Sequence, residues 1–98
     1  MDALQFVWDD RKAAENLKEH KVSFDEALTV FYDENAVQFF DDEHSEEEQR
    51  FLMLGISRGL RLLLVSHCHR EDNRMVRIIS ARKATKRESM NYPYHGKS

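Results

Sequence analysis

The sequence has few of the features that mark secreted or membrane proteins. It contains a single cysteine, Cys68, which excludes an internal disulfide framework and suits a reducing compartment. Its longest uninterrupted aliphatic run, residues 62–65, is far too short to cross a bilayer, and the N-terminal stretch lacks a signal-peptide pattern. We therefore expect a small soluble domain in the cytoplasm, with no membrane partner.

Several motifs of enzyme chemistry are also missing. The three glycines form no nucleotide-binding loop, and no serine, histidine and aspartate order typical of hydrolases is recognisable. His67, Cys68 and His69 are metal-ligand types, but on a strand the two histidines would share a face that excludes the cysteine. Since no second ligand cluster accompanies them, we expect no metal and no cofactor.

The composition nevertheless predicts a folded chain. Hydrophobic residues make up 41% of the 98 positions, which suffices for one domain over residues 1–98. Residues 1–48 contain 4 basic and 15 acidic side chains (−11), residues 49–98 contain 11 and 3 (+8), and together they give the net charge of −3. Either the two halves pair internally, or the second half presents a basic surface to an anion such as phosphate.

Hydrophobic periodicity and capping residues predict the order β-α-α-β-β-β-β-α, an α+β domain with a mostly antiparallel sheet. The expected strands cover residues 4–8, 37–40, 50–56, 61–67 and 75–80, with a loop at 68–73. Asp9 or Asp10 can cap the first helix, because a short carboxylate accepts the free N–H groups of the first turn. Ser23 with Glu26 has the capping-box spacing for the second helix.

The third and fourth strands are expected to form a hairpin. With Arg58 and Gly59 as a two-residue loop, Arg50 lies opposite His67. One face of the hairpin then carries Arg50, Leu52, Leu54, Leu63, Val65 and His67, and the other carries Phe51, Met53, Leu62 and Leu64. Because both faces are apolar, we expect helices to cover one, and a partner or the C-terminal segment to cover the other.

The last strand leads into an unusually basic segment. Residues 74–88 contain six basic side chains: Arg74, Arg77, Arg82, Lys83, Lys86 and Arg87. The following helix starts either at Ala81, which aligns like charges at i,i+4, or after Thr85, which crowds bases at the positive end of the helix dipole. Either arrangement favours a nearby anion. Phosphate or RNA is the leading interpretation, and pairing with the acidic half or with an acidic partner protein is the alternative.

Three motifs carry a resemblance over nearly the whole chain. They are FVWD at residues 6–9 with Lys12, Asn16 and KEHKVSFDEA at 18–27; D-x-x-H-S-x-x-E-x-R-F at 41–51; and R-I-I-S-A-R-x-A-T-x-x-E-x-x-x-Y at 77–92. In this order they resemble the BrnT toxin family. Asp10 stands where proline is usual and Lys21 where glycine is usual. The second departure affects the turn between the helices, because a helix end often needs a left-handed residue.

The resemblance implies a ribonuclease toxin of a bacterial type II toxin–antitoxin pair, with a RelE-like fold and metal-independent chemistry. In that mechanism a base takes the proton of the ribose 2′-OH, the oxygen attacks the adjacent phosphate, and cations stabilise the pentacovalent dianion. An acid then protonates the leaving 5′ oxygen. The implied partners are RNA and a BrnA-like, DNA-binding antitoxin, through which alone the complex would bind operator DNA.

The residues present can fill these roles. Arg77 is expected to point away from the face of its strand neighbours, and Arg82 to lie just beyond the strand; both are the expected phosphate clamps. Glu48 or His67 is the expected base or acid, with His44 as a further candidate. Arg50, Lys83, Lys86 and Arg87 are expected to bind RNA. A non-catalytic module that binds only an antitoxin or nucleic acid is the alternative function, because basic residues serve either purpose.

Overall fold

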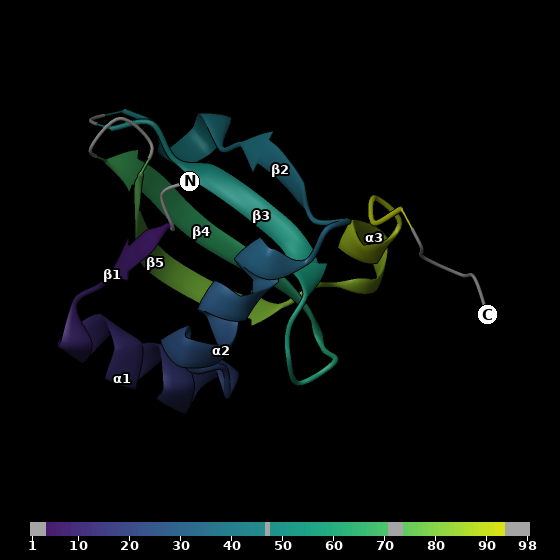
Figure 1. Ribbon diagram of the computed structural model, residues 1–98, viewed down its shortest axis with the longest axis horizontal. Helices are drawn as coiled ribbons and strands as arrows, with labels where there is room; N and C mark the ends of the chain where they lie inside the picture. Colours follow the sequence, from purple (N-terminus) through teal and green to yellow (C-terminus); the bar gives the residue numbers. More distant parts are fainter. Residues whose placement is uncertain (1–3, 47, 71–73, 94–98) are drawn as a thin grey trace.

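A computed structural model describes residues 4–46, 48–70 and 74–93, and its elements follow the expected order (Figure 1). They are β1 Gln5–Val7, α1 Asp10–His20, α2 Phe24–Thr29, the 3-10 turn η1 Val30–Tyr32, β2 Val37–Phe40, the 3-10 turn η2 Asp42–His44, β3 Phe51–Ile56, β4 Leu62–Arg70, β5 Met75–Lys83 and α3 Lys86–Ser89. The α+β class is confirmed. The loop expected from residue 68 is wrong at its start, because β4 continues to Arg70; residues 71–73 lie outside the described residues.

The five strands form one sheet in the order β1-β5-β4-β3-β2. Strand β1 is parallel to β5, and the other three pairings are antiparallel, as expected. Helices α1 and α2 pack along one side of the sheet, whereas the short α3 lies at one end (Figure 1). We call the side opposite α1 and α2 the open face. No helix in the described part of the chain is long and apolar enough to span a membrane.

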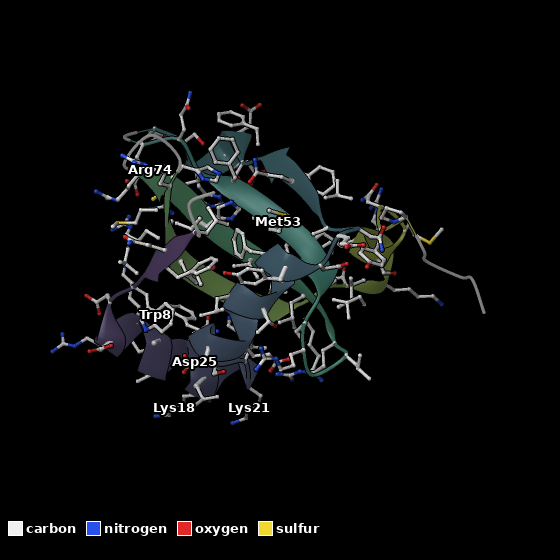
Figure 2. All side chains as sticks on the ribbon, in the orientation of Figure 1. Trp8, Lys18, Lys21, Asp25, Met53 and Arg74 are labelled. Atoms are coloured by element: carbon white, nitrogen blue, oxygen red, sulfur yellow. The ribbon has the colours of Figure 1, made fainter. Side chains whose placement is uncertain are left out.

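Local capping fixes the first two helices. The Asp9 side chain accepts a hydrogen bond from the Lys12 amide at 3.1 Å, and Ser23 accepts one from the Glu26 amide at 3.0 Å. Between the helices, Lys21 itself adopts the left-handed conformation, with φ 59° and ψ 31°, so the turn forms without glycine. The side chains of Lys18 and Lys21 point away from the sheet (Figure 2).

The register expected for the hairpin is wrong by one residue. His67 pairs with Phe51, not with Arg50, because the loop has three residues instead of two. The Ser57 amide donates to the Arg61 carbonyl at 2.9 Å, and Leu60 between them is the left-handed residue, with φ 63°. Leu60 is 84% exposed, so its side chain meets no packing constraint there. A one-residue shift exchanges the faces of one strand relative to the other.

Each side of the sheet has its own core. Leu63 and Val65 face α1 and α2 in the larger cluster, which also contains Val22, Phe24, Ala27, Val30, Val76, Ile78 and Ala81. Leu54 and Leu64 lie on the open face and pack with Tyr92. The Tyr92 hydroxyl donates to the Asp33 carboxylate at 2.7 Å, which fastens the C-terminal segment across this end of the open face. The expected cover of this face by the C-terminal segment is therefore present at Tyr92, which packs against Leu54 and Leu64.

A β-bulge in β5 decides where the basic side chains point. Arg77 pairs with Cys68 and Arg82 with Leu64, and the register shifts between Ser66 and His67. Residues five apart on a regular strand point to opposite faces, but one extra residue restores the match. Arg77 and Arg82 therefore share the open face. The expectation that Arg82 lies beyond the strand is wrong, because the Thr85 capping box starts α3 late and lets β5 run to Lys83.

Candidate active site

The open face carries two adjoining cavities. One, of about 570 Å³, lies over β3, β4 and β5 towards α3, and the other, of about 700 Å³, lies over the opposite end of β5. Both are lined by Glu43, His44 and Arg50, so they form one groove. The first also contains Ser66, Ser80, Arg82 and Glu88, and the second Glu48, Arg70 and Arg77.

Glu48 lies among three guanidinium groups in this groove. It accepts a short hydrogen bond from Arg77 and one from Arg70 at 3.4 Å, and its carboxylate lies 4.0 Å from Nε of Arg50. The Cys68 side chain and the Glu48 carboxylate both raise the pKa of Arg77. The Nε atoms of Arg50 and Arg77 are buried and have no hydrogen-bond partner among the described residues. Each of these two arginines therefore has one buried N–H group that no described residue satisfies.

Arg82 is held in a fixed orientation by α3. Its two terminal nitrogens donate to the two carboxylate oxygens of Glu88 at 2.8 and 2.7 Å. The Arg82 guanidinium, together with the Thr85 hydrogen bonds of the capping box, lowers the pKa of Glu88 to about 2. Nη1 of Arg82 also donates to the Lys83 carbonyl at 3.3 Å. These three bonds leave Nε and one proton of Nη2 without a partner among the described residues.

His44 stands on a loop at the wall of the groove. Its Nδ1 lies 3.2 and 3.0 Å from the two carboxylate oxygens of Asp41, and its side chain is 60% exposed. Ser45 secures this loop, since its hydroxyl donates to the Asp41 carbonyl at 2.6 Å and accepts from the Arg50 amide at 3.0 Å. The described residues of the motif at 41–51 thus bring His44, Glu48 and Arg50 to the same groove.

The structure does not bring His67 to this groove. With the observed register His67 faces the helices and is 0% exposed, with its ring 4.8 Å from that of Phe31. Its two ring nitrogens lie 3.1 Å from the Val65 carbonyl and 3.0 Å from the Gln38 side-chain amide. Burial lowers the pKa of His67 to about 4, so the ring is neutral at pH 7.

Of the remaining basic side chains, some line the groove and others lie outside it. Arg50 lines both cavities, whereas Lys83 and Lys86 border a separate hollow of about 350 Å³ with Arg61. Arg87 is exposed on α3. Arg70 belongs to the groove although it was expected in a loop; the signal that could have placed it is the continued alternation of β4, in which residues 64, 66, 68 and 70 share a face.

The chain matches a family model and is similar in structure to a solved toxin. The family is described as the ribonuclease toxin, BrnT, of type II toxin–antitoxin systems, and its model matches residues 8–88. The crystal structure of the Brucella abortus ribonuclease toxin BrnT is similar with a TM-score of 0.66 at 20% identity, over 86% of this chain and 100% of that one. A comparison with curated proteins finds no match. The likeness confirms the fold, and a relation to RelE stays a prediction. Because the model spans most of its length, the chain belongs to the BrnT family of ribonuclease toxins.

Proposed function

We propose that the protein cleaves RNA in the groove of its open face, by attack of a ribose 2′-OH on the adjacent phosphate. The observation that carries this proposal is the convergence of Arg50, Arg77 and Arg82 on one groove, each lining it from a different part of the chain or strand. Planar guanidinium groups match the oxygens of a phosphate and stabilise charge that develops on them. Membership of the family makes RNA the substrate and an antitoxin the partner.

Arg77 is the proposed clamp of the scissile phosphate. Glu48 and the Cys68 side chain hold the guanidinium in place, and Arg77 lines the second cavity, where its remaining terminal N–H groups are proposed to meet phosphate oxygens. Since both Glu48 oxygens already accept hydrogen bonds from Arg77 and Arg70, the geometry favours Glu48 as a positioning residue over Glu48 as the base. A carboxylate that fixes a guanidinium before the substrate arrives reduces the reorganisation needed in the transition state.

Arg82 is proposed to hold a neighbouring phosphate of the same RNA strand. Its bidentate pair with Glu88 fixes the side chain, and Arg82 lines the first cavity, where its two unused donors are proposed to meet the phosphate. Lys83, Lys86 and Arg87 extend the basic surface beyond the groove and are proposed to contact more distant phosphates. Such contacts would make RNA binding weaken as the salt concentration rises.

We further propose that the antitoxin is BrnA-like and covers this groove, and that the complex binds operator DNA through the antitoxin. The support is the cluster of Arg50, Arg77 and Arg82 in the groove, which an antitoxin would have to cover to block RNA binding. A co-expressed toxin and antitoxin that elute separately in gel filtration would contradict this proposal.

The test of catalysis is cleavage of RNA by the purified protein in the presence of EDTA. Arg77→Ala should lower the rate by about 100-fold or more, the usual loss when a transition-state charge partner is removed. Arg77→Lys should recover little of it, because an ammonium cannot grip two oxygens. Arg58→Ala is the matched control, since Arg58 is exposed on the hairpin loop outside the groove. Circular dichroism verifies folding. Full activity of Arg77→Ala would refute its role, and RNA binding without cleavage by the unaltered protein would favour the non-catalytic module.

A further inference from the structure

We propose that His44 is the general base of the ribonuclease reaction and that Asp41 is its positioning residue; this inference rests on the proposed function. Nδ1 of His44 lies 3.0 Å from the nearer carboxylate oxygen of Asp41, which can only accept a proton when ionised. The neutral imidazole therefore carries its proton on Nδ1 and has its lone pair on Nε2. Nε2 has no hydrogen-bond partner among the described residues.

The loop presents this pair rigidly at the groove. The Asp41 amide donates to the Arg50 carbonyl at 2.8 Å, and the Ser45 hydroxyl links the Asp41 carbonyl to the Arg50 amide. The Asp41 carboxylate is mostly buried, whereas the His44 ring is open to solvent, so the orienting group is sheltered and the reactive atom is accessible. This division is that of a base whose carboxylate fixes its tautomer.

The other described histidines do not reach the groove. His20 ends α1, His67 is buried on the helix-covered side, and His69 lies beside it with Nε2 3.2 Å from the Gln38 side chain. His44 lines both cavities together with Arg50, so it lies between the two proposed phosphate positions. The ribose that links two neighbouring phosphates lies between them, and its 2′-OH is the group that attacks. A base that lies between the two phosphate positions is therefore next to the proton that it must remove.

The cleavage step needs no reagent besides the RNA and water. Nε2 of His44 takes the proton of the 2′-OH while O2′ forms a bond to phosphorus and Arg77 stabilises the charge on the phosphoryl oxygens. The bond from phosphorus to O5′ breaks, and water supplies the proton to the leaving O5′. The products are a 2′,3′-cyclic phosphate and a 5′-hydroxyl end, and the imidazolium returns its proton to solvent.

The competing explanation is that Asp41 and His44 merely stabilise the 3-10 turn η2, and chemical rescue separates the two. His44→Ala should lower cleavage by about 10²- to 10⁴-fold, the range for losing a general base, while RNA affinity changes little. Added imidazole should restore part of the rate, because the site is open to solvent, and a purely structural role would not respond to it. His20→Ala, at an exposed position outside the groove, is the matched control.

Asp41→Asn tests the positioning role in the same assay. The amide keeps the shape of the carboxylate but can donate to Nδ1, which favours the tautomer with the proton on Nε2. We expect a loss of cleavage of about 10-fold or more that disappears when His44 is already alanine, since the two residues act as a unit. If the unaltered protein cleaves RNA and His44→Ala cleaves it equally well, the role of His44 as the base is overturned while the proposed function stands. If the unaltered protein does not cleave RNA, the proposed function is overturned and the inference with it.

Discussion

Acidification should destabilise the protein through its buried histidine. His67 is neutral in the fold because burial lowers its pKa from 6.5 to about 4. Above pH 6.5 the ring is neutral in both the folded and the unfolded chain, so it contributes no pH dependence. As the pH falls from 6.5 to 4, His67 binds a proton in the unfolded chain but not in the folded chain, so the free energy of unfolding decreases. Below pH 4 both states bind it and the loss is complete.

The magnitude follows from the two pKa values. Between pH 7.5 and pH 5 the loss is about 2 kcal/mol, and the full loss below pH 4 is about 3.4 kcal/mol, at 1.36 kcal/mol for each unit of pKa difference. His69 adds to the same trend, because burial lowers its pKa too. The lowered pKa of Glu88, about 2, affects stability only below pH 4.5, outside this window.

Urea unfolding at pH 7.5 and pH 5 measures the effect directly. His67→Phe keeps a ring between Phe31 and Phe51, but phenylalanine cannot bind a proton. Between pH 7.5 and pH 5 the variant should therefore lose about 2 kcal/mol less of its free energy of unfolding than the unaltered protein. The quantity compared is the change in the free energy of unfolding between the two pH values. Because His69 and any difference in absolute stability are common to both pH values or both proteins, they cancel in this comparison. Equal pH dependence in both proteins would refute the reasoning and would mean that His67 binds protons in the fold as readily as in the unfolded chain.

Two further predictions concern stability. Asn16→Ala should lower the free energy of unfolding by about 3 kcal/mol in urea, because the buried amide donates to the carbonyls of Val22 and Ala81 and accepts from the Ala81 amide, leaving three groups unpaired. Glu15→Ala, at an exposed position on the same helix, should change it little, and equal losses would contradict the assignment. Lys21→Gly should raise the melting temperature through a gain of about 0.5–1 kcal/mol, because glycine adopts the left-handed conformation without steric cost. A lower melting temperature would show that the Lys21 side chain matters more than its backbone.

The features that the sequence predicts correctly depend on neighbours within one helical turn. Asp9, Ser23 and Thr85 each cap a helix through an amide three residues ahead. The residue types identify Ser23 and narrow the other two starts to Asp9 or Asp10 and to Ala81 or Thr85. The succession of strands along the chain follows in the same way from the local alternation of apolar and polar residues. These patterns need no knowledge of which segments meet in space.

The features that the sequence does not reveal depend on a single residue of register. A three-residue loop ending in a left-handed Leu60 is unexpected, because glycine stands next to it and suits that conformation better. The resulting shift places Leu54 on the open face, whereas His67 stays with Leu63 and Val65 on the helix-covered side. The bulge near Ile79 has no signal in the residue types, yet it decides that Arg77 and Arg82 face the same side. Pairing between distant strands sets both outcomes.

The same geometry explains the division of charge along the chain. Of the two interpretations of the acidic first half and the basic second half, internal pairing is observed, and an anion-binding surface stays a proposal. Glu26 pairs with Arg61 and Glu48 with Arg77, so carboxylates of the first half do neutralise arginines of the second. Arg82 instead takes its partner Glu88 from its own half, and Arg50 approaches Glu48 only at 4.0 Å. The second cavity is lined by three arginines and by Glu43, Glu46 and Glu48, so its formal charges balance. Of these carboxylates, Glu48 is the one that contacts all three arginines, and the proposed RNA phosphate would meet guanidinium groups that it already holds in place.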